Sequence, residues 1–193
     1  LGHTEDGITL CEEAIRMSPD TEKPYFFLAE MMHKKEDPEA VVNYYYQVLE
    51  RNPNSFSTYF ELGNYFKKIK CFNMALRFYE KCISVKPDFI KAHFKKAKIF
   101  SSIGKHENSI SELKKIIELD NQNSKAFDLI GTELEQLNFK EEAKERYLDA
   151  VYLDKDNSNP YYNLGNNLIN SGKLVDAHEC LDKFQKNIPY STK

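Results

Sequence analysis

Lysine side chains at helical spacing are the residues of this chain best suited to bind a charged partner. Lys91, Lys95 and Lys98 are four and three residues apart, so a helix would place them on one face. Ammonium groups gathered on one face attract carboxylate and phosphate groups and speed association with an acidic partner. We therefore expect an acidic or phosphorylated peptide to dock here. The alternative is an ordinary solvated lysine face.

Amide and aromatic side chains extend this predicted binding surface. Asparagine amides can hydrogen-bond the backbone of an extended peptide, and aromatic rings can anchor its apolar side chains. The predicted partner-binding residues are Asn64, Lys67, Lys91, Lys95, Lys98, Asn163 and Asn166, and the predicted apolar anchors are Phe60 and Phe94.

Spacings typical of catalysis or metal binding are missing from the sequence. It contains no glycine-rich phosphate loop, no GxSxG turn and no HExxH segment. His178, Glu179 and Cys180 are adjacent, but neighbouring residues on a helix point about 100° apart and cannot all face one ion. We expect a protein that is not an enzyme and that holds no metal and no cofactor.

Composition and cysteine spacing place the chain among ordinary water-soluble proteins. Its 193 residues are 41% hydrophobic and 30% charged, with a formal net charge of -3. The 4 cysteines form no CxxC pair, which predicts reduced thiols. The sequence has no signal peptide and no apolar run long enough to span a membrane. We expect a cytoplasmic protein without membrane insertion.

Charge is distributed unevenly along the chain. Residues 1–64 carry 5 basic and 12 acidic side chains, a formal charge of -7. Residues 65–98 carry 10 basic and 2 acidic side chains, a formal charge of +8, and include Lys67 and the three lysines of the predicted docking face. Such an asymmetry bears on the choice of partner rather than on the fold.

An internal repeat sets the elements that would position these residues. Pro19, Pro53, Pro87 and Pro189 are separated by multiples of 34 residues. Within each row of 34, two stretches have apolar residues three and four apart, separated by turn residues, which predicts two amphipathic helices per row. We expect residues 1–193 to form a single array. It consists of full rows at 22–55, 56–89, 90–123, 124–157 and 158–191, preceded by the second helix of a truncated row at 1–21.

Equivalent positions of the rows carry side chains of the same kind. An aromatic column runs Tyr25, Tyr59, His93, Phe127 and Tyr161, and a column of small residues runs Ala29, Gly63, Ala97, Gly131 and Gly165. A small residue is needed where two helices cross closely, because a larger side chain would hold the backbones apart. With the row-ending proline and the 34-residue period, these columns resemble the tetratricopeptide repeat family. His93 and Lys96 depart from this pattern, since each stands in an apolar column.

The resemblance implies a fold and a class of function. The fold would be all-α, a right-handed α-α superhelix of antiparallel helix pairs whose first helices line a concave groove. The function would be that of a non-enzymatic scaffold that binds a partner peptide or subunit in this groove, within a larger protein or multisubunit assembly. Two alternatives remain open: a substrate-recruiting segment of a larger enzyme such as a glycosyltransferase, and an RNA-binding helical-repeat protein. The lack of an arginine cluster argues against the second.

Lys91 and Lys95 also resemble the basic pair with which chaperone-binding tetratricopeptide domains hold a peptide's terminal carboxylate. The remaining positions of that clamp would fall on Phe26, Glu30 and Glu61. Two glutamates would repel a carboxylate rather than hold it. The charge pattern therefore argues against this ligand.

Both ends of the sequence are predicted to carry apolar residues that no neighbouring helix covers. Ile8 and Ile15 lie at the start, and Phe184 and Ile188 lie near the end. Either the chain is part of a longer protein or a second copy covers these faces. We therefore expect self-association through the uncapped ends.

Overall fold

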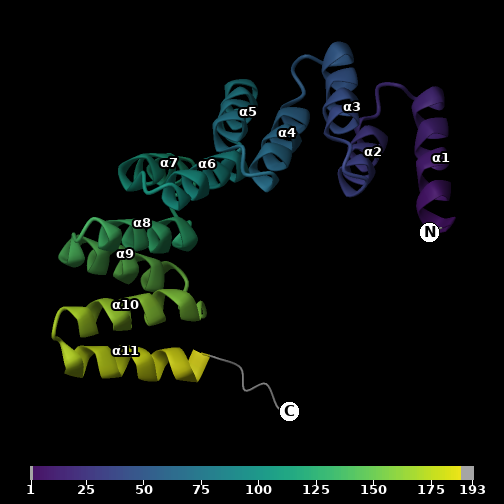
Figure 1. Ribbon diagram of the computed structural model, residues 1–193. Coiled ribbons are helices and arrows are strands. Elements are labelled where there is room, and N and C mark those ends of the chain that lie inside the picture. The colour runs from purple at the N-terminus through teal and green to yellow at the C-terminus, as the bar shows by residue number, and fades with distance from the viewer. Residues whose placement is uncertain (1, 188–193) are drawn as a thin grey trace. The chain divides into compact units, whose positions relative to one another are not determined.

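Helices make up the regular structure throughout the part of the chain that is described. The computed structural model describes residues 2–187, and the side chains of residues 5–182 (Figure 1). The helices are α1 (Gly2–Met17), α2 (Glu22–Lys34), α3 (Pro38–Arg51), α4 (Phe56–Lys68), α5 (Phe72–Val85), α6 (Ile90–Ser102), α7 (His106–Leu119), α8 (Ser124–Gln136), α9 (Lys140–Leu153), α10 (Ser158–Asn170) and α11 (Leu174–Asn187). The predicted all-α fold is confirmed.

Helix lengths follow the repeat. The first helix of every pair, α2, α4, α6, α8 or α10, has 13 residues. The second helix, α3, α5, α7, α9 or α11, has 14 residues. Each first helix begins at the residue where a row was predicted to begin. The 34-residue period of the sequence is therefore also the period of the helix starts and helix lengths.

The helices group into two compact units, Leu1–Ala92 and His93–Lys193, and the boundary falls within α6. In the first unit α1 packs on α2, α2 on α3, α3 on α4 and α4 on α5. In the second unit α7 packs on α8, α8 on α9, α9 on α10 and α10 on α11. Within each unit these contacts join helices that are adjacent in sequence, as in repeat proteins. The single array over residues 1–193 stays a prediction.

Side-chain caps fix several helix starts. The Asp37 carboxylate accepts a hydrogen bond from the Ala40 amide at 3.0 Å, and Pro38 occupies the first turn of α3. This is the start that an Asp-Pro pair favours, because the aspartate satisfies an amide that lacks a helical partner and proline lacks that amide. Ser55 caps α4 in the same way through the Thr58 amide.

The turn inside each helix pair uses one left-handed residue at the same place in every row. Its φ is positive at Glu36 (59°), Lys70 (61°), Gly104 (73°), Asn138 (65°) and Gly172 (74°). Glycine adopts this conformation without a steric penalty and asparagine tolerates it, whereas lysine and glutamate are strained there. The spacing of 34 between these residues is the repeat expressed in backbone dihedral angles.

The column of small residues is explained by the packing of tyrosines on glycines. A Cβ added at Gly63 would lie 2.5 Å from the Tyr79 ring, and one at Gly131 would lie 2.5 Å from the Tyr147 ring. Both tyrosines are at most 1% exposed, so neither ring has space to retreat. The prediction that this column needs small residues for close helix packing is confirmed.

The two ends differ in what the structure describes. Ile8 and Ile15 of α1 are half-buried, while Leu10 and Met17 of the same helix are 65% and 85% exposed. The side chains of Phe184 and Ile188 lie outside the described residues. Self-association through the ends stays a prediction. Among residues 2–187, no helix combines the length and the apolarity needed to cross a membrane.

Candidate partner-binding surfaces

Helix α6 places the predicted docking lysines on one face. Lys91 and Lys98 are exposed and Lys95 is half-buried, whereas Lys96 points into the protein and is 7% exposed. The four- and three-residue steps therefore separate the outward lysines from the inward one, as helix geometry requires. Lys91 belongs to the first unit, and Lys95 and Lys98 belong to the second.

A hollow of about 370 Å³ lies beside these lysines in the second unit. We call it the lysine hollow. Its lining comes from α6, α7 and α8 and consists of Phe94, Lys95, Ala97, Lys98, Ser101, Ser109, Leu113, Lys125, Leu129 and Glu133. The Lys125 ammonium lies 5.4 Å from the centre of the Phe94 ring, a cation–π contact that couples this predicted anchor to a third lysine.

Polar groups in the lysine hollow favour a negatively charged occupant. Three ammonium groups line it, and the one carboxylate in the lining, that of Glu133, is already 2.7 Å from Nδ1 of His106. The Ser109 hydroxyl is buried and has no hydrogen-bond partner among the residues whose side chains are described. A buried hydroxyl without a partner costs free energy, and an anion entering the hollow would supply an acceptor.

The other predicted contact residues are distributed over both units. Asn64 lies in the first unit, where its side chain accepts a hydrogen bond from the Tyr79 hydroxyl at 2.9 Å and donates one to Glu61 at 3.2 Å. Lys67 is half-buried near the end of the same helix, α4. Phe60 packs within the unit, with its ring centre 5.1 Å from that of Phe89. Intramolecular contacts therefore occupy Phe60 and Asn64.

The two predicted asparagines of α10 have different surroundings. Asn163 donates a hydrogen bond to Asp128 of α8 at 2.8 Å, which links two successive first helices. Burial raises the pKa of the Asp128 carboxyl, and this hydrogen bond opposes the rise. Asn166 is half-buried on the same helix, α10.

A buried ionic cluster was missed by the sequence reasoning. Glu112 of α7, 5% exposed, contacts His93 Nδ1 at 2.8 Å and Lys96 Nζ at 3.0 Å, both from α6. Lys115 reaches the same carboxylate at 3.0 Å. Burial alone would raise the pKa of Glu112, but the hydrogen bonds from His93, Lys96 and Lys115 lower it to about 2. The two residues that depart from the apolar columns are thus joined through one carboxylate.

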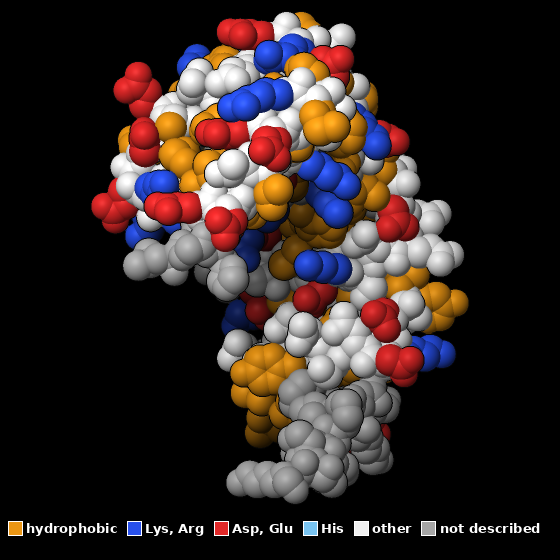
Figure 2. All heavy atoms as spheres, turned by 90° about the vertical axis from the view of Figure 1, so that its right-hand side faces the viewer, with side chains coloured by type: hydrophobic (Ala, Val, Ile, Leu, Met, Phe, Trp, Pro, Cys, Tyr) orange, Lys and Arg blue, Asp and Glu red, His pale blue; other side chains and the backbone are white. Residues whose placement is uncertain are grey.

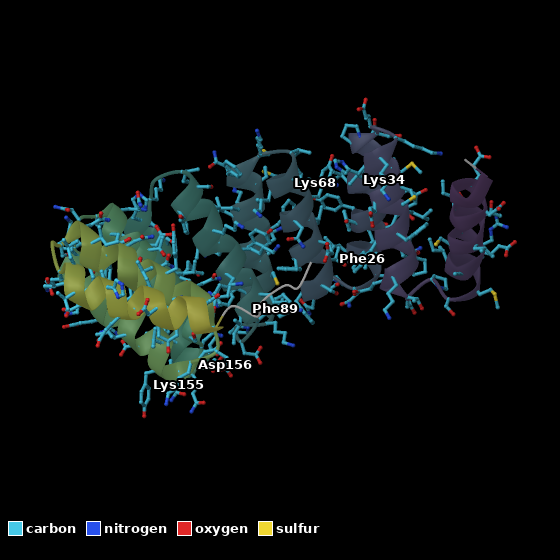
Figure 3. All side chains as sticks on the ribbon, turned by 90° about the horizontal axis from the view of Figure 1, so that it is seen from below. Phe26, Lys34, Lys68, Phe89, Lys155 and Asp156 are labelled. Atoms are coloured by element: carbon cyan, nitrogen blue, oxygen red, sulfur yellow. The ribbon has the colours of Figure 1, made fainter. Side chains whose placement is uncertain are left out.

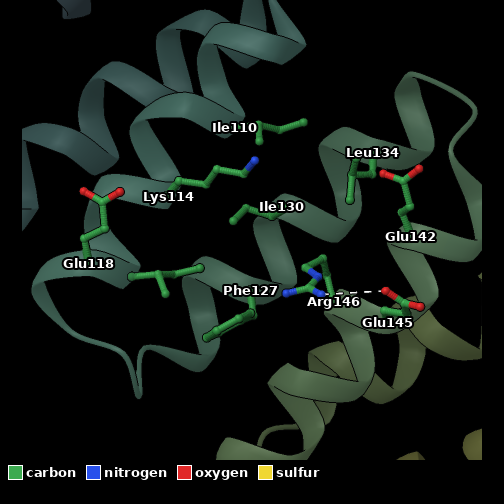
Figure 4. A pocket seen from close by; sticks show the side chains of 10 residues that line it. Ile110, Lys114, Glu118, Phe127, Ile130, Leu134, Glu142, Glu145 and Arg146 are labelled. Atoms are coloured by element: carbon green, nitrogen blue, oxygen red, sulfur yellow. Dashed lines mark ion pairs between the residues drawn. The ribbon is translucent and has the colours of Figure 1, made fainter.

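A second hollow in the same unit, of about 490 Å³, lies on α7, α8 and α9 (Figure 4). Its floor includes Ile110, Phe127 and Ile130, and its rim carries both signs of charge. Arg146 pairs there with Glu145 at 3.7 Å. The face shown in Figure 2 is similarly mixed, with acidic and basic side chains interspersed among apolar ones. Charges that compensate one another do not select an ionic ligand.

The described side chains contain no group of three or more histidine, cysteine, aspartate or glutamate residues that could hold a metal ion. His178 pairs instead with Asp182 one turn away, at 3.4 Å. Cys71 is exposed, Cys82 is buried, and Cys11 and Cys180 are half-buried.

Solved structures define the class of the fold. MamA is similar over 88% of this chain and 92% of its own, with a TM-score of 0.72 and 19% identity. MamA from Desulfovibrio magneticus RS-1 gives a TM-score of 0.71 at 17% identity, covering 86% of this chain and 94% of that one. YrrB, described as a TPR protein with an unusual peptide-binding site, gives 0.68 at 18% identity, covering 94% and 93%. The chain has the fold of a tetratricopeptide-repeat solenoid.

The sequence itself matches the family in its second and third rows. The family model for the tetratricopeptide repeat matches residues 56–89 and 90–123, the same boundaries as two predicted rows. The chain therefore carries tetratricopeptide repeats, and the resemblance found in the sequence is confirmed. A search of curated proteins found no match.

Proposed function

We propose that the chain is a non-enzymatic interaction scaffold that binds a protein partner on the faces of its first helices. Similarity to a TPR protein described by its peptide-binding site supports this class of function. Repeat proteins of this kind present extended surfaces rather than closed catalytic pockets. A cytoplasmic location and self-association through the ends are parts of the proposal.

The lysine hollow carries the more specific part of the proposal, the docking of an acidic or phosphorylated side chain of the partner. Three ammonium groups line the hollow together with the apolar side chains of Phe94 and Leu129. The lining also holds the Ser109 hydroxyl, which has no partner among the described side chains. Exposed ion pairs contribute roughly 0.2–1 kcal/mol each. Binding should therefore be weak and salt-sensitive unless apolar side chains of the partner also reach the floor.

Charge reversal at the lysine hollow tests this function. Lys95, Lys98 and Lys125 are replaced together by Glu, and binding of fluorescein-labelled peptides containing glutamate or phosphoserine is followed by fluorescence anisotropy. The expected result is loss of binding with an unchanged helical circular dichroism spectrum, and a wild-type affinity that falls as salt is raised.

A matched control makes the same change in net charge at three lysines outside the lysine hollow. Lys35, Lys105 and Lys114 are exposed and do not line the lysine hollow, so their replacement by Glu should leave peptide binding intact. Equal loss of affinity in both triple variants would mean that the loss arises from the change in net charge and not from the lysine hollow. Unchanged affinity in the Lys95, Lys98 and Lys125 variant would refute the site.

A further inference from the structure

A hollow of about 440 Å³ in the first unit combines carboxylates with aromatic rings. We call it the acidic hollow. It lies on the first helices α2 and α4 and on α3, and its lining consists of Phe26, Phe27, Ala29, Glu30, His33, Val41, Tyr45, Glu61, Asn64, Tyr65 and Lys68. Its volume falls within the range of ordinary ligand pockets. It belongs entirely to the first unit and is separate from the lysine hollow.

Aromatic rings, set at angles to one another, form one wall of the acidic hollow. The rings of Phe26 and Tyr45 pack at 5.7 Å between centres, and His33 meets the Tyr65 ring edge-on at 5.6 Å. Phe26 lies away from Lys34 and Lys68, which mark the other end of α2 and α4 (Figure 3). Ring faces of this kind attract a cation.

Two carboxylates, Glu30 and Glu61, line this hollow together with Tyr45 and Lys68. Burial raises the pKa of Tyr45 well above its ordinary value, and the charges of Glu61 and Glu30 raise it further. Glu30 is partly compensated by Lys34 at 3.3 Å, in a pair that is about 60% exposed, and Glu61 accepts one hydrogen bond from Asn64. Both carboxylates therefore keep acceptor capacity for a further donor.

The repeat supplies an internal comparison for Tyr45. The equivalent hydroxyl of Tyr79 donates to Asn64 at 2.9 Å, and that of Tyr147 donates to Glu135 at 3.1 Å, so each bonds the first helix of its own row. The residue equivalent to Asn64 in the first row is Glu30. Tyr45 is 6% exposed, and no hydrogen bond joins its hydroxyl to any residue whose side chain is described. The tyrosine hydroxyl that is hydrogen-bonded to the first helix in the second and fourth rows therefore lacks this hydrogen bond in the first row.

We propose that the acidic hollow binds an arginine side chain of a protein partner. A guanidinium is planar and stacks on aromatic rings, and its donors can bond two carboxylates and a tyrosine oxygen at the same time. The first unit, residues 1–92, carries 12 basic and 14 acidic side chains, a formal charge of -2, and the lining sets Glu30 and Glu61 against Lys68, so the local charge favours a basic side chain beside the two carboxylates. This surface therefore selects a partner segment of opposite charge to the one expected at the lysine hollow.

The experiment compares arginine with citrulline, which has nearly the same shape and no charge. An array of 12-residue peptides, each with two arginines in varied glycine, serine, alanine and leucine backgrounds, is probed with the full chain alongside the matching citrulline peptides. The best arginine peptide is then titrated by fluorescence anisotropy. We expect the citrulline form to bind at least about 10-fold more weakly, since charge-assisted hydrogen bonds are lost.

Variants of the protein locate this binding. Glu30→Gln with Glu61→Gln should weaken the arginine peptide roughly 10-fold, and Tyr45→Phe should weaken it by a few-fold while keeping the ring. The control pair Glu39→Gln and Glu50→Gln changes exposed carboxylates of α3 outside the lining and should have no effect.

The outcomes also separate this site from the lysine hollow. The Glu30 and Glu61 variant should keep its affinity for the phosphoserine peptide, and the lysine-reversal variant should keep its affinity for the arginine peptide. Equal binding of arginine and citrulline peptides would overturn the proposal, as would unchanged affinity in the Glu30 and Glu61 variant. A lysine peptide that binds as tightly as the arginine peptide would overturn the choice of guanidinium.

Discussion

The ionic cluster of Glu112, His93 and Lys96 predicts opposite outcomes for single and combined substitutions. Removing the charge by Glu112→Gln takes away the carboxylate that the buried Lys96 ammonium and the buried His93 ring contact. Replacing all three residues by their equivalents in the second row, Tyr for His93, Leu for Lys96 and Phe for Glu112, restores an apolar environment. The single change should destabilise strongly, and the triple change should not.

The magnitude follows from the pKa of Glu112. A fall from 4.5 to about 2 corresponds to roughly 3 kcal/mol of stabilisation of the ionised form in the folded protein, at 1.36 kcal/mol per unit. This agrees with the about 3–5 kcal/mol typical of breaking a buried pair. The triple variant should lie within about 1 kcal/mol of the wild type or above it, since the equivalent Tyr59, Leu62 and Phe78 are uncharged. In the second row the Lys81 ammonium, the equivalent of Lys115, lies over the rings of Tyr59 and Phe78.

The dependence on pH gives an independent check. Because the folded pKa of Glu112 lies below its ordinary value, the stabilisation is complete above about pH 4.5 and is lost as the pH falls towards 2. Urea unfolding followed by circular dichroism at pH 7 and between pH 2 and 5 measures both effects. The wild type should lose stability over this acid range by about 3 kcal/mol more than Glu112→Gln.

Two results would refute this reasoning. One is a Glu112→Gln variant as stable as the wild type at pH 7, which would mean that the cluster contributes nothing net. The other is a triple variant as unstable as the single one, which would mean that the cost arises from shape rather than from an uncompensated charge.

The other predictions concern packing, turns and thiols. Gly131→Leu should destabilise by about 1–3 kcal/mol in urea unfolding, because even a Cβ there would lie 2.5 Å from the Tyr147 ring; an unchanged midpoint would contradict the packing argument. Lys70→Gly should raise the free energy of unfolding by about 0.5–1 kcal/mol, and with it the melting temperature, because the φ of Lys70 is 61°. A lower melting temperature would show that the turn is unstrained. With a thiol reagent at pH 8, Cys71 should react quickly and Cys82 slowly, since burial raises the pKa of Cys82 to about 11; equal rates would mean that Cys82 is accessible.

Local patterns in the sequence were sufficient to predict the helices and the closest contacts between the two helices of a row. The row starts coincide with the first residues of the first helices, and Asp37 caps α3 as its type and position indicate. The glycines at 63 and 131 proved to be contact points for tyrosines of the second helices. Each of these features depends on residues within one 34-residue row, where spacing alone specifies which side chains meet.

The buried charges could not be found in this way. A glutamate between apolar positions of a helix is normally solvated, so Glu112 and Glu133 gave no signal of burial. Glu133 belongs to a buried column that the sequence reasoning did not identify, together with Met31, Tyr65, Ile99 and Asn167. One clue was available, since His93 and Lys96 stand in apolar columns and need an opposite charge from a facing helix. Phe60 was likewise predicted as an anchor without its contact to Phe89, which lies just before α6.

The contact between His106 and Glu133 bears on how a self-similar chain folds in the correct order. Rows with interchangeable apolar columns can pair out of register by a whole repeat, because a neighbour one row away offers nearly the same surface. His106 at the start of the third row's second helix meets Glu133 in the first helix of the fourth row, at 2.7 Å. At the equivalent position the other first helices offer Met31, Tyr65, Ile99 or Asn167. A misordered stack that set Pro38, Phe72 or Leu174 in the place of His106 would bury the Glu133 carboxylate without a hydrogen-bond partner there. The His106–Glu133 contact therefore favours the correct order of rows at this junction.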